Sequence, residues 1–196
     1  MSPIDALSPN INKEDSIVVQ SSTIKSLAHS MGFFACGIAK AAPVDKAVAQ
    51  KYRKWLENGE EASMAYMTNY LEKRLDPRLL VPGVRSIVSL ALNYAPAQQL
   101  PKGEYQIAAY ALGLDYHDLM KQKMRELAIK ITERWQLPKQ EEGEEPSVRC
   151  FCDTAPVLER YWAQKAGLGW VGRNHQLIIP HAGSMFFLGE IFLPFD

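Results

Sequence analysis

The sequence predicts a mixed α/β fold, of the α+β kind, in a single domain. Segments with apolar residues at helical spacing alternate along the chain with short, continuously apolar runs typical of strands. The chain has 196 residues and is 47% hydrophobic, which is enough to bury one sizeable core. It shows no internal repeat and no glycine-rich phosphate loop of the Walker or Rossmann type.

The N-terminal residues 1–15 are rich in Ser, Pro, Asn and Asp and show no apolar periodicity. A disordered leader is therefore expected there, followed by one folded domain over residues 16–196. In its first half the spacing of apolar residues predicts, in order, a helix over 17–31, a strand over 33–39, a helix over 43–58 and a helix near 64–70.

Residues 85–94 form a nearly continuous apolar run, which predicts a central strand that is covered on both faces. An amphipathic helix is expected over 116–135, with Pro138 as its stop. The rest of the chain predicts a short strand over 148–153, a helix over 157–165, and strands over 176–180 and 184–193. Together these elements predict a mixed sheet flanked by helices.

Charge and hydropathy exclude two classes of protein. The 22 basic and 22 acidic residues balance, so the chain lacks the overall basic excess of a nucleic-acid binder, and any contact with a polyanion must be local. No apolar run approaches the roughly 20 residues that a membrane helix needs, and no secretory signal is recognisable. We expect a soluble, cytoplasmic protein without a membrane partner.

No metal site is predicted from the cysteines or histidines. Cys36, Cys150 and Cys152 form no even disulfide framework and lack the partners of a zinc or iron–sulfur site, so we interpret them as buried free thiols. The four histidines include no pair at metal-ligand spacing within a helix.

The densest chemical signal begins at Asp153. This residue follows an apolar stretch and precedes Pro156, so it should lie at a strand end, where a carboxylate can be half-desolvated and suits an acid of tuned pKa. The same pattern also fits an aspartate that merely caps the helix that Pro156 opens.

Gly167, Gly169 and Gly172 surround Trp170, a spacing that implies positive φ angles or close approach of the backbone to a bulky, flat ligand. The alternative is a helix C-cap followed by a tight turn into a strand.

Two upstream residues are also ambiguous. Arg74 could bind an anionic or amide group of a ligand, or pair at the surface with Glu72 or Asp76. His117 lies at an expected helix start that Asp115 would cap, so it does not by itself indicate a metal or a base.

These blocks together resemble the epoxyqueuosine reductase family, cobalamin-dependent iron–sulfur enzymes that complete queuosine in the tRNA anticodon. The resemblance spans residues 22–193. It is carried most specifically by Lys73-Arg74-Leu75-Asp76-Pro77 with Leu80-Val81-Pro82-Gly83, by Gly113-Leu114-Asp115-Tyr116-His117, and by Asp153-Thr154-Ala155-Pro156-Val157 with Ala166-Gly167-Leu168-Gly169-Trp170.

The resemblance implies a nitroreductase-like cobalamin-binding module, shared with reductive dehalogenases, in which the cofactor lies base-off in a broad cleft. It implies that Asp153 is the catalytic proton donor. It further implies cobalamin contacts at or near Arg74, Ala108, Asp153, Leu158, Glu159, Arg160, Leu177, Pro180 and Leu188.

The reaction implied by the resemblance is the last step of queuosine biosynthesis, a two-electron reductive removal of the epoxide oxygen. The substrate is a tRNA anticodon stem-loop that carries epoxyqueuosine, and an acid protonates the leaving oxygen. A carboxylic acid donates near neutral pH only if burial raises its pKa, and the apolar neighbours Phe151, Ala155 and Val157 make this plausible.

The chain also departs from the family pattern. The family continues into a ferredoxin-like part whose cysteines hold two [4Fe–4S] clusters, and this sequence ends at Asp196 without those ligands. An iron–sulfur domain or electron-donor protein is therefore an expected partner. Leu114 and Ala109 stand where basic residues are common, which argues against a strong tRNA footprint, and Arg173 replaces the usual lysine.

Two other interpretations remain open. One is a cobalamin-binding or trafficking module without reductase activity. The other is a flavin-binding, nitroreductase-like protein, because the two folds resemble each other. The absorbance spectrum of the bound cofactor separates flavin from cobalamin.

Overall fold

The computed structural model describes residues 13–98, 101, 103, 105–137 and 147–196. The predicted leader, residues 1–15, lies outside this part except for its last three residues, which are the start of helix α1 (Lys13–Ser30). Pro138, the predicted helix stop, also lies outside it. No helix in the described ranges is long and apolar enough to cross a membrane.

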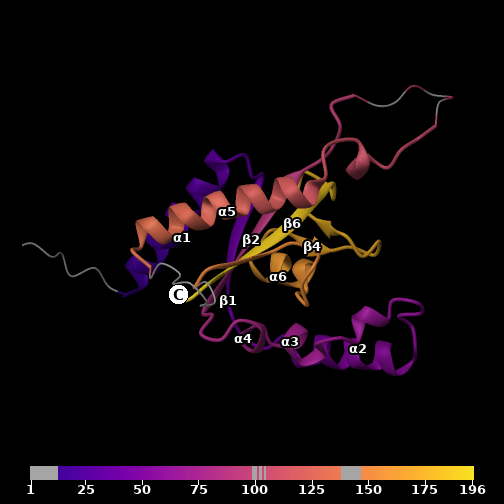
Figure 1. Cartoon of the computed structure of the whole chain (residues 1–196), viewed down its shortest axis with the longest axis horizontal. Coiled ribbons are helices and arrows are strands. Elements are labelled where there is room, and N and C mark those ends of the chain that lie inside the picture. The colour runs from indigo at the N-terminus through magenta and orange to yellow at the C-terminus, as the bar shows by residue number, and fades with distance from the viewer. Residues whose placement is uncertain (1–12, 99–100, 102, 104, 138–146) are drawn as a thin grey trace, which may run out of the picture.

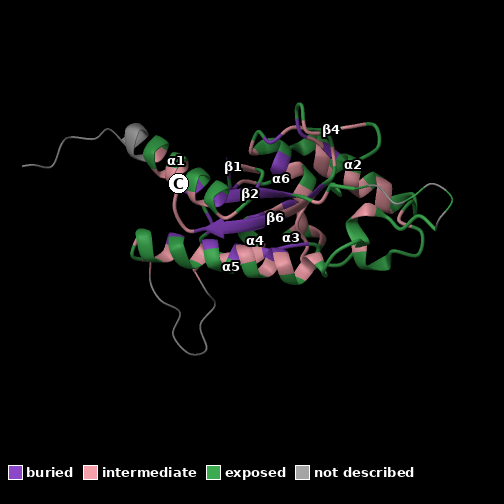
Figure 2. Ribbon diagram, turned by 90° about the horizontal axis from the view of Figure 1, so that it is seen from above, coloured by how far each residue is buried: buried purple, intermediate pink, exposed green. Residues whose placement is uncertain are grey.

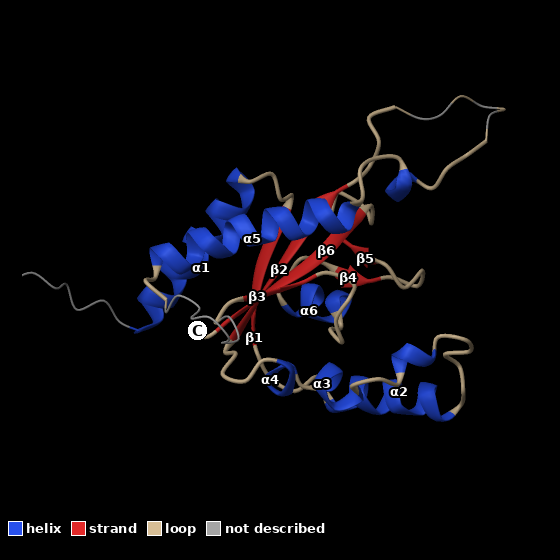
Figure 3. Cartoon of the chain, in the orientation of Figure 1, coloured by secondary structure: helices blue, strands red, loops and turns tan. Residues whose placement is uncertain are grey.

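A four-stranded sheet forms the centre of the molecule, in the order β1 (Ala35–Lys40), β2 (Ser86–Asn93), β6 (Phe186–Leu193) and β3 (Arg149–Phe151). The two longest strands, β2 and β6, occupy the middle (Figure 3). Seven of the eight residues of β2 are buried, as its apolar run predicted.

The α+β class is confirmed, but the predicted mixture of parallel and antiparallel strands is wrong. All three strand pairs of this sheet are antiparallel. An apolar run shows that a strand is covered on both faces, and it carries no information on the direction of its neighbours. The connections between these strands are long enough to allow either direction, so the pattern alone does not predict it.

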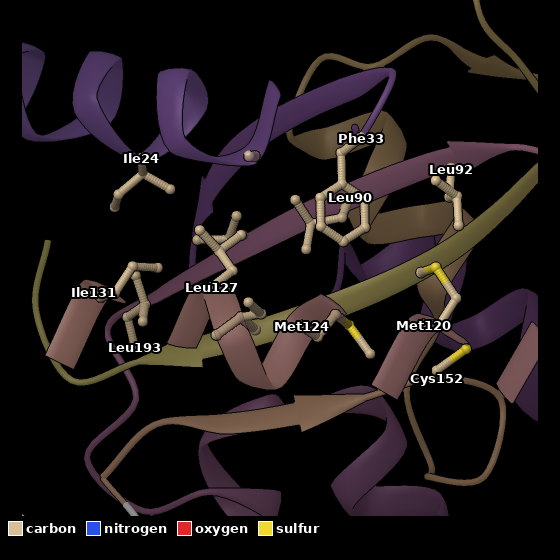
Figure 4. Close-up of a cluster of buried hydrophobic side chains, with 13 residues drawn as sticks. Ile24, Phe33, Leu90, Leu92, Met120, Met124, Leu127, Ile131, Cys152 and Leu193 are labelled. Atoms are coloured by element: carbon tan, nitrogen blue, oxygen red, sulfur yellow. The ribbon is translucent and has the colours of Figure 1, made fainter. Parts of the chain in front are cut away.

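Helices cover both faces of the sheet (Figures 1 and 2). On one face lie α1 and α5 (Tyr116–Arg134), and their apolar side chains meet those of β2 and β6 in the main core. Ile24, Leu90, Met124 and Leu127 are among the fully or almost fully buried members of this core (Figure 4). This burial positions the N-terminus of α5, which carries part of the site described below.

The other face is covered by α6 (Glu159–Lys165) and by the segment that contains α2 (Lys46–Glu57), α3 (Leu71–Leu75) and α4 (Pro77–Leu80). Trp162 of α6 packs here against Phe192 of β6 and Ile87 of β2. Gly37 of β1 allows the close approach of α6, because a Cβ atom at this position would lie 2.2 Å from the carbonyl oxygen of Ala166.

The remaining elements are short. They are a two-stranded ribbon, β4 (Trp170–Val171) with β5 (Leu177–Ile178), and two 3₁₀ helices, η1 (Ala65–Met67) and η2 (Ala109–Ala111). The helix predicted near residues 64–70 is thus a single 3₁₀ turn.

Two of the glycines around Trp170 serve the turn into this ribbon. Gly167 has φ 82° and follows the end of α6, and a Cβ at Gly169 would lie 2.0 Å from the carbonyl oxygen of Ile178. The helix C-cap and tight turn therefore account for these positions.

Candidate active site

A cavity of about 300 Å³ opens where the start of β6, the N-terminus of α5 and the N-terminus of α6 meet. Its lining combines an aromatic and apolar wall with a carboxylate pair and an arginine. The lining residues are Tyr94, Tyr110, Tyr116, Asp153, Glu159, Arg160, Gln176, Leu177, Ser184, Phe186, Phe187 and Leu188.

Asp153 lies at the mouth of this cavity, just after β3. Its φ of 57° is uncommon for a residue with a side chain and indicates that the surroundings hold the backbone in place. Its backbone N–H donates to Oε1 of Glu159 at 2.6 Å, and its carboxylate accepts a hydrogen bond from the phenol of Tyr116. The side chain is 46% exposed, so it faces the open side of the cavity.

The helix-cap interpretation of Asp153 is wrong. Helix α6 begins at Glu159, and its N-cap is Leu158, which makes no side-chain capping bond. Pro156 therefore does not open the helix, and the Asp153 carboxylate is free to face the cavity. The apolar burial predicted around Asp153 is incomplete here, since this side chain remains partly exposed.

Tyr116, the first residue of α5, orients the aspartate. Its ring is stacked between Phe187, at 4.2 Å and an interplanar angle of 4°, and His117, at 4.1 Å. Burial and the nearby carboxylates raise the pKa of Tyr116, so its phenol stays protonated and acts as a donor. Sequence reasoning missed this role, although the residue belongs to one of the motifs it singled out.

His117 is held by contacts at the start of α5. Asp115 caps α5 as predicted, accepting from the backbone N–H of His117 at 2.9 Å, and it also lies 2.9 Å from Nδ1 of His117. Nε2 of His117 lies 3.7 Å from Asp153, so the imidazole adds a second polar neighbour to the aspartate.

Glu159 is the second acid of the site. Burial, and secondly the negative charge of Asp153, raise the pKa of Glu159 to about 8, whereas the backbone N–H of Asp153 opposes this rise. Arg160 next to it donates to the carbonyl oxygen of His175 at 2.6 Å, which ties α6 to the loop between β4 and β5. Glu159 is thus a carboxyl group that can carry a proton near neutral pH.

The structure brings together most of the residues predicted to contact a cofactor. Five of them line the cavity: Asp153, Glu159, Arg160, Leu177 and Leu188. Three more lie beside lining elements: Ala108 precedes η2, Leu158 precedes α6 and Pro180 follows β5. The aromatic wall of Tyr94, Phe186 and Phe187 was not predicted, because single aromatic residues in apolar runs look like core.

Arg74 lies apart from this group. It lines a separate small pocket with Pro156 and Trp162, and its Nε is buried without a hydrogen-bond partner among the described residues. The surface ion pairs proposed for it are absent in the described chain, since Glu72 pairs with Arg53 and Asp76 pairs with Arg78.

The three cysteines are free, as predicted, but Cys36 and Cys150 are only partly buried, whereas Cys152 is buried. Burial raises the pKa of Cys36 and Cys150 to about 12 and also raises that of Cys152, so none of them is a ready thiolate.

Comparison with known proteins gives consistent matches. The family model described as "Epoxyqueuosine reductase QueG, DUF1730" matches residues 74–154. The chain is 42% identical over 176 residues to the epoxyqueuosine reductase of Cellulophaga algicola, an alignment that covers 90% of this chain and 55% of the relative. The chain spans about half the length of the curated relatives that it matches.

Solved structures share the fold. The epoxyqueuosine reductase of Streptococcus thermophilus superposes with a TM-score of 0.74 at 26% identity, covering 88% of this chain and 45% of that one. An epoxyqueuosine reductase solved with an epoxyqueuosine-modified tRNA-Tyr stem loop gives a TM-score of 0.72 at 23% identity, covering 92% and 47%.

Proposed function

We propose that this chain belongs to the epoxyqueuosine reductase family and forms the cobalamin-binding catalytic part of such an enzyme, over residues 16–196. The observation that carries the proposal is the placement of Asp153. Tyr116 donates to this carboxyl group and Glu159 accepts from the backbone N–H of Asp153, beside a cavity with an aromatic wall, where the carboxyl group can meet a substrate above a bound cofactor.

The residues present fit a large, flat and mainly apolar group. Phe186, Phe187 and Leu188 supply an apolar wall, and exposed apolar side chains lie on neighbouring segments, among them Trp170 and Met185. A cavity of about 300 Å³ takes only part of a corrin ring, so these exposed side chains would cover more of it. Cobalamin in its base-off state, as in the family, is the cofactor that we propose.

When bound, cobalamin would supply electrons at the carbon of the epoxide, which is chemistry that no side chain provides. Asp153 would protonate the oxygen that leaves. Tyr116 would orient Asp153, because its stacked ring and its phenolic O–H fix the position of the carboxylate. A substrate placed against the partly exposed Asp153 would displace water from it and favour its protonated form.

We propose as substrate a tRNA anticodon stem-loop that carries epoxyqueuosine, the ligand present in a structurally similar relative. Acting on tRNA would place the enzyme in the cytoplasm. The net charge of zero means that tRNA contacts would be local and would depend on a few residues around the cavity. The electrons would come from an iron–sulfur domain or a separate donor protein, which is the second proposed partner.

The proposal is tested by incubating the protein together with its iron–sulfur part, cobalamin, a low-potential reductant and a modified tRNA stem loop, followed by mass spectrometry of the nucleosides. Conversion of epoxyqueuosine to queuosine that requires cobalamin is expected. Saturable cobalamin binding without conversion would contradict the reductase and favour a cobalamin carrier. Conversion that depends on a flavin would contradict the choice of cofactor.

A further inference from the structure

A second buried carboxyl group lies beneath α6. Glu190 of β6 is 0% exposed, and neither of its carboxylate oxygens has a hydrogen-bond partner among the described residues. In the sheet it lies opposite Ser89 of β2 and Phe151 of β3. The hydroxyl of Ser89 is also buried and likewise has no partner in the described part of the chain.

This row of residues faces α6. Gly37 of β1 lies opposite Ser89, and a Cβ at Gly37 would meet Ala166 at the end of α6. Because side chains of directly paired residues in neighbouring strands point to the same face, Ser89 and Glu190 also point toward α6. The first residue of that helix is Glu159, so the two glutamates belong to one packed layer.

The charges around Glu190 are negative. Glu159 from α6 and Asp153 from the segment after β3 both act on it, and the pKa of the neighbouring Cys152 thiol is raised by burial first and then by the charges of Glu159, Asp153 and Glu190. β1 and β2 contribute Gly37 and Ser89, neither of which titrates. The cation beside Glu159 is Arg160, which is already bonded to the carbonyl oxygen of His175.

A carboxylate without a cation or donor is very costly in a protein interior, so Glu190 is neutral. Burial raises the pKa of Glu190 far above its ordinary value, which agrees with this assignment. Glu159 accepts a hydrogen bond from the backbone N–H of Asp153 at 2.6 Å, and burial raises the pKa of Glu159 to about 8, so this carboxyl group too carries a proton near neutral pH. Protons therefore reside on both glutamates behind Asp153.

The proposed reaction needs more than one proton. Removal of an epoxide oxygen as water, leaving a carbon–carbon double bond, consumes two electrons and two protons. The electrons come from the iron–sulfur donor. Asp153 carries a single proton, so it must be reprotonated within the same turnover or be joined by a second acid.

We infer that Glu159 and Glu190 form a proton store that supplies this second proton through Asp153. Asp153 first gives its proton to the oxygen of the opening epoxide and becomes a carboxylate. Glu159 then transfers its carboxylic proton to Asp153, which delivers it to the hydroxyl group as that group leaves as water. Glu190 keeps its own proton in the layer beneath α6, and solvent at the cavity mouth reprotonates Glu159. This inference rests on the proposed function.

The first test observes the store without any turnover. Infrared spectra of the chain at pH 7 should show carbonyl-stretch bands of protonated carboxyl groups, one of which is lost in Glu159→Gln and another in Glu190→Gln. Glu133→Gln, at an exposed position on α5, should lose neither band. If the wild-type chain shows no protonated carboxyl band at pH 7, the store does not exist.

The second test measures single turnover of the protein with its iron–sulfur part. At saturating cobalamin, Glu159→Gln should slow conversion about 100-fold, and Glu159→Asp should recover part of the rate, because general acid catalysis typically contributes 10²–10⁴-fold. Glu190→Gln should shift the alkaline limb of the pH profile, which a purely structural role would not move. Glu133→Gln should match the wild type.

The outcomes separate the two claims. An active wild type whose rate and pH profile are unchanged by both Glu159→Gln and Glu190→Gln would overturn the proton store and leave the reductase in place. A wild-type protein that does not reduce epoxyqueuosine would contradict the proposed function itself. Solubility and the near-ultraviolet circular dichroism of each variant show whether the fold is retained.

Discussion

Asp153 owes its position to neighbouring side chains and not to a helix of its own. Tyr116 donates to its carboxylate, Glu159 accepts from its backbone N–H, and His117 lies nearby. Its backbone is held in a conformation that few residues with side chains adopt. At the scale of single residues, the site is therefore a small network in which each member fixes another.

Asp153→Asn should abolish the proton donation without changing the shape of the site. We expect turnover in the presence of the iron–sulfur part to fall by about 100-fold or more, with cobalamin binding unchanged. Single-turnover assays and absorbance titration measure the two effects. Asp118→Asn, at an exposed position on α5, is the matched control. Wild-type turnover in Asp153→Asn would contradict the assignment of Asp153 as the proton donor.

Tyr116→Phe removes one hydroxyl group and keeps the ring that stacks on Phe187. Without the donor, Asp153 should be less well oriented, and we expect turnover to fall roughly 10-fold, the equivalent of one hydrogen bond of about 1.4 kcal/mol. Kinetics at saturating substrate measure this effect. Tyr105→Phe, at a fully exposed position, is the control, and equal rates in both variants would show that the Tyr116 hydroxyl does not act.

The sequence predicted which residues carry chemistry better than it predicted how these residues contact one another. Asp153 and Glu159 were both predicted for the site, and the cavity contains both. The roles of Tyr116 and Glu190 were not predicted. The function of a tyrosine at a helix start, or of a glutamate in an apolar strand, depends on neighbours that are distant in sequence. The buried Glu190 has one detectable signal, a charged residue at an inward position of the strand over residues 184–193.

At the scale of elements, the contact between β1 and α6 sets the geometry of the acids. Gly37 allows the end of α6 to lie directly on the sheet, and Glu159 begins the same helix. Periodicity predicted both elements, since each buries a recognisable apolar pattern. It did not predict the antiparallel order of the strands or their close contact with α6, which depend on tertiary packing.

Gly37→Ala should push α6 away from the sheet, because its Cβ would lie 2.2 Å from the carbonyl oxygen of Ala166. Overpacking of this kind costs about 1–3 kcal/mol, which the midpoint of urea unfolding will show. Gly113→Ala introduces the same methyl group where nothing lies within 4 Å and serves as the control. Equal stability of the two variants would mean that α6 tolerates a shift from β1.

At the scale of the whole molecule, buried acids link stability to pH. Folding raises the pKa of Glu159 from 4.5 to about 8 and also raises the pKa of Glu190. Between pH 4.5 and about pH 8 the folded chain therefore binds more protons than the unfolded chain. Their stabilising contribution is therefore fully present below about pH 4.5 and is lost as the pH rises through the folded-state values.

The free energy of unfolding should consequently fall between pH 5 and pH 8, by at most about 1.4 kcal/mol per pH unit for each group. Urea unfolding at several pH values measures this slope, and Glu190→Gln should flatten it. A stability that stays level or rises across this window in the wild type would contradict the buried, protonated state of these carboxyl groups.

The central claim is that this fold holds cobalamin beside Asp153, and titration with cob(II)alamin tests it most directly. Absorbance and electron paramagnetic resonance should show saturable binding and a base-off spectrum, for the chain alone or for the protein with its iron–sulfur part. Failure of both to bind cobalamin, or displacement of cobalamin by a flavin, would contradict the claim.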